Sequence, residues 1–174
     1  MSIFYDNKSM FINPSTHPEL TIFGNKQIFL AGPIQGAPDW QKEIGSRIVE
    51  KLNNIVVTSP RCDGKPSNYE NQVKWETHYL YNADIILFYI PDKIEDIEGR
   101  CYAQTTGFEM GEWIAKAKYL NNHKKIILSM SDNYPLKRYI ETRVKNMRND
   151  YITIADFGMD STINCLCNII KGAL

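Results

Sequence analysis

Residues 84–116, DIILFYIPDKIEDIEGRCYAQTTGFEMGEWIAK, decide the fold of this chain. The run over residues 84–90 is short, apolar and rich in β-branched and aromatic residues, which predicts a buried strand. After an acidic loop, Thr105 and Thr106 are candidate N-caps of a helix over residues 105–119. A strand, a loop and a helix in this order form the repeating unit of a parallel α/β sheet.

The same unit recurs on both sides of this segment. Strands are predicted over residues 27–31, 54–58, 84–90, 124–130 and 151–155. Helices are predicted from a cap at Asp39 to Leu52, over residues 69–82 and 105–119, from Pro135 to Met147, and from a cap at Asp160 to Lys171. We therefore expect an α/β three-layer sandwich with a five-stranded parallel sheet, flavodoxin-like or Rossmann-like. Residues 1–174 should form a single domain, with an irregular N-terminal arm over residues 1–26 and the α/β core over residues 27–174.

Composition narrows the class of protein. Lys and Arg number 20, as do Asp and Glu, so the formal net charge is zero, and we expect no nucleic-acid polymer and no membrane as partner. The N-terminus lacks the basic start and apolar stretch of a signal peptide, which favours a cytoplasmic protein. The four cysteines and three histidines are scattered without metal-ligand spacing. We therefore expect no metal and no cofactor.

Glu109 is the first candidate for chemistry. A glutamate three residues after Thr106 completes a capping-box pattern, so Glu109 could serve only the helix terminus. Its position supports a second interpretation, because ligands of parallel α/β sheets bind beyond the carboxyl ends of the strands. A carboxylate there could act as a nucleophile or as a general acid or base, with Phe108 and Trp113 shaping its surroundings.

The loop over residues 32–38 is the second candidate, because it joins a strand to a helix and is rich in Gly and Pro. It matches no phosphate-binding motif and holds no Lys or Arg, so a neutral ligand fits at least as well as a phosphate. Other polar residues have ordinary interpretations when taken alone. Trp75 is a core or interface aromatic, Glu76 a solvated helix residue and Asp84 a turn residue. The acidic residues of the loop could bind Mg²⁺ only if they converged, namely Asp92, Glu95, Asp96 and Glu98.

Four short motifs in order carry a resemblance to a known family. They are IFLAGPI at residues 28–34, WE and AD at residues 75–76 and 83–84, YIP at residues 89–91, and GFEMG at residues 107–111. Together they resemble the nucleoside 2-deoxyribosyltransferase family, whose flavodoxin-like domain uses a glutamate nucleophile. The resemblance implies that Glu109 is this nucleophile and that Glu76 binds and protonates the base. The implied substrate-binding residues are Gly32, Pro33, Ile34, Gln35, Trp75, Asp84 and Gln104.

Three positions depart from the family pattern. Phe29 stands where the family often has a tyrosine that orients the glutamate, and Tyr89 or Tyr102 could substitute for it. Ala103 stands where the family has a second base-binding carboxylate, a place that Gln104, Asp96 or Glu98 could take over. Relatives that hydrolyse deoxynucleoside 5′-monophosphates have Ser and Arg in the first loop, where this chain has Pro33 and Gln35.

The resemblance implies transfer of the sugar of a 2′-deoxynucleoside to a free nucleobase through a covalent intermediate on Glu109. Alternatives are an N-glycoside hydrolase of nucleoside 5′-monophosphates, a non-catalytic nucleotide-binding module, and an interaction domain with solvated loop carboxylates. A homo-oligomer, a dimer or larger, is also expected, because the arm has no evident partner in the core and aromatic residues are common in the loop-bearing stretches. These aromatic residues are Phe4, Tyr5, Tyr69, Tyr79, Tyr81 and Tyr102.

Overall fold

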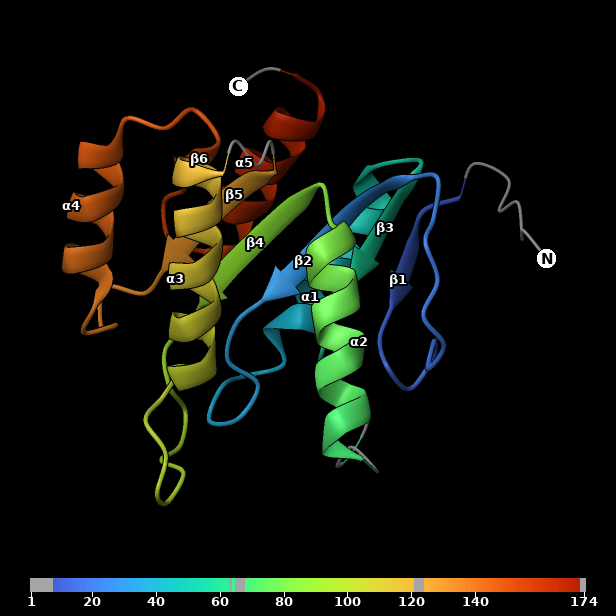
Figure 1. Cartoon of the computed structure of the whole chain (residues 1–174), viewed down its shortest axis with the longest axis horizontal. Helices are drawn as coiled ribbons and strands as arrows, with labels where there is room; N and C mark the ends of the chain where they lie inside the picture. Colours follow the sequence, from blue (N-terminus) through green and yellow to red (C-terminus); the bar gives the residue numbers. More distant parts are fainter. Residues whose placement is uncertain (1–7, 63, 65–67, 121–123, 173–174) are drawn as a thin grey trace.

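The structure, a computed structural model, describes residues 8–62, 64, 68–120 and 124–172. Within these residues strands and helices alternate along the chain (Figure 1). The strands are β1 (Met10–Ile12), β2 (Lys26–Ala31), β3 (Ile55–Thr58), β4 (Ile85–Ile90), β5 (Lys125–Met130) and β6 (Ile152–Ile154). The helices are α1 (Trp40–Lys51), α2 (Tyr69–Asn82), α3 (Gln104–Tyr119), α4 (Lys137–Met147) and α5 (Met159–Ile170). None of these helices is both long and apolar enough to cross a membrane.

The strands form one parallel sheet in the order β1-β3-β2-β4-β5-β6. Without β1 this is the flavodoxin order, so the predicted fold class is confirmed. The predicted strand count was five, and the structure adds β1 at the edge beside β3. A strand of three residues beside Asn13 and Pro14 is too short to show a period in the sequence.

The N-terminal arm is not irregular throughout, and it packs on its own core. Besides β1, the arm accepts hydrogen bonds from α2, where Trp75 Nε1 donates to the carbonyl of His17 at 2.7 Å and Tyr79 to that of Glu19 at 3.1 Å. Phe11 lies against Gly45 of α1, where a Cβ would come within 2.4 Å of its ring. The expectation that the arm lacks a partner within its chain is therefore wrong.

Helices cover both faces of the sheet. In Figure 1, α2, α3 and α4 lie in front of the strands and α1 and α5 behind them. One core cluster accordingly joins alternate strand residues such as Phe29, Ile86 and Phe88 to α2 and α3. The other joins residues such as Leu30 and Leu87 to α1 and α5. This alternation arises because successive side chains of a strand point to opposite faces.

The helix starts show which local signals were read correctly. Asp39 caps α1 as predicted, with its carboxylate accepting from the backbone N–H of Lys42. α3 starts earlier than predicted, and Ala103 occupies its N-cap in a left-handed conformation with φ 56°. Gly158, not Asp160, holds the N-cap of α5. Asp160 forms an ion pair with Arg47 of α1 instead, joining the two helices.

Candidate active site

The chain reverses its direction of winding between β2 and β4, which lie side by side in the sheet. Beyond the carboxyl ends of these strands lie the loops over residues 32–38 and 91–103. Gly32 begins the first loop so close to β4 that a Cβ there would lie 2.2 Å from the carbonyl oxygen of Tyr89. Only glycine fits this approach. Ligands of doubly wound folds bind in the crevice at such a switch point.

Arg61, which sequence reasoning missed, holds the first loop in place. Its Nη2 donates to the carbonyls of Ile34 at 2.9 Å, Pro38 at 3.1 Å and Ala37 at 3.3 Å. Its Nε donates to Oε1 of Gln41 at 3.2 Å. The guanidinium therefore stabilises the conformation of the loop through these hydrogen bonds. The sequence feature that could have indicated this role is the position of Arg61 just beyond the end of β3.

The acidic loop folds onto the first loop and brings a second arginine to it. The backbone N–H of Ile94 donates to the carbonyl of Gly36 at 2.8 Å. Arg100 Nη1 donates to Oε1 of Gln35, also at 2.8 Å. The first loop lacks a basic residue of its own, yet an exposed guanidinium from residues far along the chain lies beside it.

Glu109 lies in the second turn of α3 and is largely removed from solvent. The capping-box interpretation is wrong, because the helix begins at Gln104 and Thr106 is a buried residue within it. Burial, followed by the charges of Glu76 and Glu112, raises the pKa of Glu109 to about 7. A carboxyl group with such a pKa changes its charge near neutral pH, which suits a group that takes part in catalysis.

Glu76 approaches the same place from α2. Gln72, one turn earlier, donates to its Oε1 at 2.6 Å. The amide of Gln72 also donates to the carbonyl of Pro60 at 2.8 Å, and its oxygen accepts from the Cys62 thiol at 3.0 Å. Burial raises the pKa of Glu76, while the bond from Gln72 opposes this rise. The charge of Glu76 acts on Glu109, so the structure brings together the two carboxylates that the sequence singled out.

Three other predicted residues, Trp75, Asp84 and Gln104, have different surroundings. Trp75 is buried and its indole N–H is bonded to the arm, as described above, so its ordinary interpretation as a core aromatic holds. Asp84 precedes β4 at the amino edge of the sheet, roughly 20 Å from the carboxyl end of a six-residue strand. Its Oδ2 accepts from the backbone N–H of Gln27 at 2.7 Å, which ties β2 to β4. Gln104 is exposed at the start of α3.

Among the described residues, neither tyrosine considered as a substitute at Phe29 forms a hydrogen bond with Glu109. Phe29 itself is buried on the α2–α3 face of the sheet. Tyr89 lies on the opposite face, 5.1 Å from the ring of Trp40 and 5.7 Å from that of Phe157. Tyr102 donates its hydroxyl hydrogen to the carbonyl of Pro91 at 2.8 Å.

The acidic residues of the loop do not converge. Asp92 accepts from Ser131 and, at 2.9 Å, from Nδ2 of Asn133, and these bonds lower its pKa. Asp96 pairs with Lys93 at 2.5 Å. Within the described ranges, no group of three or more His, Cys, Asp or Glu side chains is arranged to hold a metal ion. Asp92 therefore joins the loops after β4 and β5, a role that its sequence context did not reveal.

Two open hollows lie on the surface away from the carboxylate pair. One, of about 540 Å³, follows α4 and is lined by polar residues such as Asp132, Lys137 and Lys145. The other, of about 330 Å³, lies at the amino edge of the sheet around Asn82 and Asp84. Neither is lined by Glu76 or Glu109, so the chemistry of the side chains locates the candidate site better than the depth of the surface.

The comparisons with known proteins identify a family for this part of the chain. A family model described as nucleoside 2-deoxyribosyltransferase like matches residues 25–124, which is more than half of the chain. The matched part runs from the start of β2 to the residue before β5 and contains the first loop, Glu76 and Glu109. A search of curated proteins found no match.

Proposed function

This chain belongs to the nucleoside 2-deoxyribosyltransferase-like family, and from that premise we propose that it transfers the sugar of a 2′-deoxynucleoside from one nucleobase to another. The observation that carries the proposal is the pair of half-buried carboxyl groups, Glu76 and Glu109, on neighbouring helices beside the switch point, both with a raised pKa. Two carboxyl groups are what cleavage of a glycosidic bond with retention requires, because one attacks and the other handles the proton.

In the first half of the reaction, an oxygen of the ionised Glu109 attacks C1′ of the sugar. The bond between C1′ and the base nitrogen breaks, and its electron pair leaves with the base. Glu76 delivers a proton to that base, so the free base departs neutral and Glu76 becomes a carboxylate. The transition state has oxocarbenium character, which the negative charge of Glu109 stabilises before the covalent bond forms.

In the second half, a nitrogen of another base attacks C1′ and gives up its proton to Glu76. The bond between C1′ and Glu109 breaks, and its electron pair returns to the carboxylate. Water at the same place would give hydrolysis instead, so transfer depends on how well the incoming base excludes water. Glu76 thus serves as acid in one direction and as base in the other.

In the free protein, burial raises the pKa of both carboxyl groups, so each is harder to ionise than in water. The bond from Gln72 favours the charged form of Glu76, whereas burial and the charge of Glu76 favour protonated Glu109. The reaction needs Glu109 ionised and Glu76 protonated. A donor to Glu109 is therefore required when the site is assembled.

The test uses deoxyadenosine or deoxyuridine, incubated with the protein with and without a second free base and followed by chromatography. The proposal expects a new deoxynucleoside only when the second base is present. Base release without exchange would favour hydrolysis. Absence of both would favour the non-catalytic nucleotide-binding module or the interaction domain.

Hydrolysis of nucleoside 5′-monophosphates is the second candidate, and the contact of Arg100 with Gln35 favours it. A phosphate bound beside the first loop would find this exposed guanidinium, since Arg–phosphate bonds are charge-assisted. We nevertheless propose the nucleoside as the better substrate, because Arg61 is committed to loop carbonyls and Arg100 is solvated. A higher kcat/KM for the monophosphate, lost selectively in Arg100→Gln, would reverse this order.

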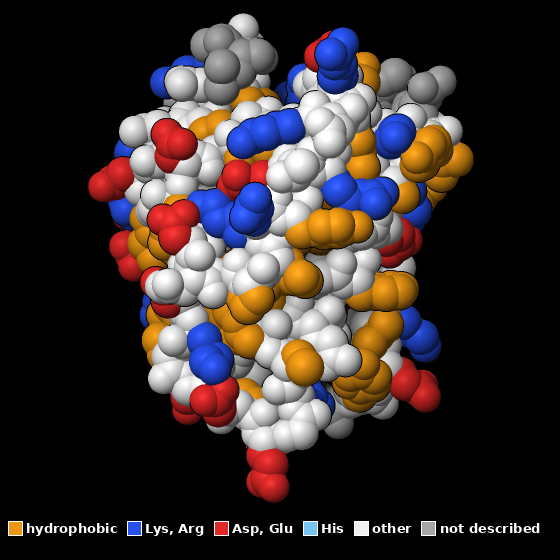
Figure 2. Space-filling model, turned by 90° about the vertical axis from the view of Figure 1, so that its left-hand side faces the viewer, with side chains coloured by type: hydrophobic (Ala, Val, Ile, Leu, Met, Phe, Trp, Pro, Cys, Tyr) orange, Lys and Arg blue, Asp and Glu red, His pale blue; other side chains and the backbone are white. Residues whose placement is uncertain are grey.

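We also propose that the chain forms a homo-oligomer, although its N-terminal arm packs on the core of its own chain. The helices that carry the carboxylates expose large aromatic side chains, namely Tyr69, Tyr81, Phe108 and Tyr119. Figure 2, which faces α4, shows further hydrophobic side chains gathered between charged ones, and on α4 Tyr139 is exposed. Phe4 and Tyr5 lie outside the described residues. Light scattering should give a multiple of the 20.1 kDa chain mass, and a mass near 20.1 kDa would contradict oligomerisation.

A further inference from the structure

Trp113 of α3 carries a buried hydrogen-bond donor that has no partner. Its side chain is 3% exposed, and its Nε1 is one of two buried side-chain polar atoms without a partner in the described part of the chain. The other is Oε1 of Gln27, an acceptor at the amino edge of the sheet. Buried donors are rarely left unbonded, so each such group calls for an explanation.

The other two tryptophans show that this is not a general property of indoles here. Trp40 Nε1 donates to the carbonyl of Pro33 at 3.0 Å, and Trp75 Nε1 donates to that of His17 at 2.7 Å. Both are as buried as Trp113. The missing bond is therefore specific to the tryptophan of the candidate site.

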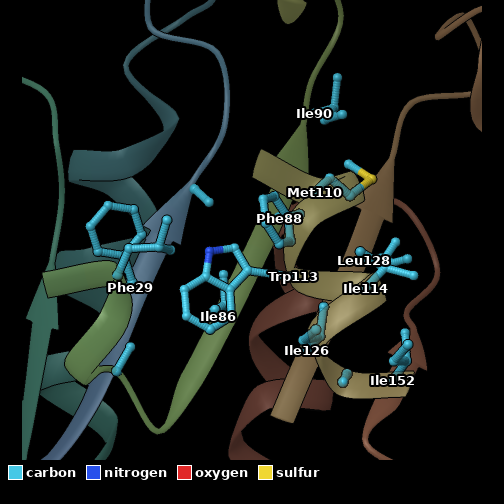
Figure 3. Packing of buried hydrophobic residues seen from close by; sticks show 14 of the residues in the cluster. Phe29, Ile86, Phe88, Ile90, Met110, Trp113, Ile114, Ile126, Leu128 and Ile152 are labelled. Carbon is cyan, nitrogen blue, oxygen red and sulfur yellow. The ribbon is translucent and has the colours of Figure 1, made fainter. Parts of the chain in front are cut away.

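The helical spacing places Trp113 and Glu109 near each other. The two residues are four apart on α3, so they share a face of the helix. Side chains of a helix lean toward its N-terminus, which favours an approach of the indole nitrogen to the turn that carries Glu109. Figure 3 shows the indole between Phe29 and Phe88, with its nitrogen turned toward the carboxyl ends of β2 and β4.

Within the ranges that the structure describes, Glu109 lacks a hydrogen-bond donor, just as the Trp113 indole lacks an acceptor. Among the described residues, no hydrogen bond or ion pair holds its carboxylate, in contrast to Glu76, which has Gln72. Phe29, on the strand beneath, has no hydroxyl to offer. A carboxylate without a donor is poorly oriented and difficult to ionise, because no bond favours its charged form.

We propose that Trp113 is the positioning residue of Glu109, donating its indole hydrogen to the carboxylate when that carboxylate ionises. This inference rests on the proposed function, in which Glu109 must be charged and aimed at C1′. Bonding to the charged form favours ionisation of Glu109 and leaves the proton of the pair on Glu76. The indole would thus orient Glu109 in place of a tyrosine at the Phe29 position of β2.

Several charged or titratable groups face this part of the site. Glu112 and Lys116 lie on α3, Glu76 and Tyr81 on α2, and Lys124 just before β5. The Nζ atoms of Lys116 and Lys124 lie 4.3 Å and 5.5 Å from the centre of the Trp113 ring. All of them are retained in the variants below, so differences between variants report on the indole and Glu109.

The first test needs no enzymatic turnover. The indole N–H signals of ¹⁵N-labelled protein are followed by NMR from pH 5 to pH 9, with Trp113→Phe to assign the signals. The Trp113 signal should move with a midpoint near that of Glu109, about 7, while those of Trp40 and Trp75 stay with their carbonyl partners. The movement should vanish in Glu109→Gln. A Trp113 signal that does not titrate, or that titrates equally in Glu109→Gln, overturns the proposal even if the protein proves to be a transferase.

The second test measures turnover against pH. Trp113→Phe should lower kcat about 10- to 100-fold, the usual effect of one hydrogen bond to a charged group, with a smaller change in KM. The acid limb of its kcat profile should move to higher pH, because Glu109 loses the bond that favours its ionisation. Adding Phe29→Tyr should recover part of the loss by placing a hydroxyl on the neighbouring strand.

Trp75→Phe is the matched control, since it also removes an indole bond, but one that is made to the N-terminal arm. It should reduce thermal stability without moving the acid limb. An unchanged profile in Trp113→Phe, or the same shift in Trp75→Phe, contradicts the positioning role. If Trp113→Phe does not fold, the wild-type and Glu109→Gln NMR titrations still decide, with the Trp113 signal assigned by elimination through Trp40→Phe and Trp75→Phe.

Discussion

The two faces of the sheet treat polar groups differently. On the α1–α5 face, the hydroxyls of Ser129 and Thr162 bond each other at 2.8 Å, and the indole of Trp40 has its carbonyl. On the α2–α3 face, Glu109 and the indole of Trp113 lack hydrogen-bond partners in the part of the chain that the structure describes. Both faces are otherwise packed with apolar side chains to a similar degree.

Under the proposed function, this difference separates residues that stabilise the fold from residues that take part in the reaction. A buried group that is satisfied stabilises the protein, and one that is unsatisfied destabilises it. Unsatisfied groups persist where an activity needs them, so stability and function oppose each other at such sites. The unbonded groups of the α2–α3 face should therefore respond to mutation with lost activity, and the bonded hydroxyls of the α1–α5 face with lost stability.

Glu109→Gln is the strongest test of the proposed difference between the two faces. We expect glycosidic turnover to fall by on the order of 10⁴-fold or more, because the attacking oxygen is replaced by an amide of the same shape. Initial rates with deoxyadenosine, at matched circular dichroism, measure the change. Near-wild-type rates would remove Glu109 from the mechanism.

Glu76→Ala tests the second carboxylate and should cost less, about 10²- to 10⁴-fold, as for the loss of a general acid. The loss should depend on the leaving group, since a good one needs little protonation. Rates are compared for an ordinary deoxynucleoside and a nitrophenyl deoxyriboside. An equal loss with both substrates would assign Glu76 to positioning of the sugar or to structure.

Stability against pH gives the next prediction. The pKa of Glu109 is about 7 in the folded chain and 4.5 ordinarily, so the unfolded chain loses its proton first as the pH rises. Stability should therefore fall between about pH 4.5 and pH 7, and the penalty should be absent at lower pH. Glu109→Gln should gain up to about 3 kcal/mol at pH 8 and nothing at pH 4.

Urea unfolding at the two pH values measures this gain. Glu43→Gln is the matched control, because its carboxylate is exposed on α1, pairs with Arg47 at 3.8 Å and is not among the charges that act on Glu109. The control should lose a few tenths of a kcal/mol at most. A gain for Glu109→Gln that does not depend on pH would contradict the raised pKa as its cause.

The smallest effect is expected on the opposite face. Thr162→Val leaves the buried hydroxyl of Ser129 without its partner and should cost about 1–3 kcal/mol of unfolding free energy. Turnover at saturating substrate should stay at the wild-type level below the melting temperature. A large fall in kcat would mean that the two faces do not divide their roles as described.

Much of the fold could be read from the chain, because buried parallel strands appear as continuous apolar runs. The central strand β4 spans Ile85–Ile90, within one residue of the predicted run, and the helix over residues 69–82 has the predicted bounds. β1 escaped because its three residues show no period. The start of α3 was misplaced because Ala103 caps it through backbone conformation, which leaves no mark in side-chain type.

The sequence by itself determined the parallel α/β fold and, through its ordered motifs, indicated Glu76 and Glu109 as the candidate carboxylates. Only the tertiary structure decided the surroundings of these two carboxylates. Gln72 is bonded to Glu76, Arg61 holds the first loop, and the Trp113 indole N–H has no partner among the described residues. The tertiary structure also placed Asp84 at the wrong edge for the site. The reason is physical. Periodicity reports which face of an element is buried, whereas bonds such as that of Arg61 to Ile34 join residues 27 apart and depend on where whole elements pack.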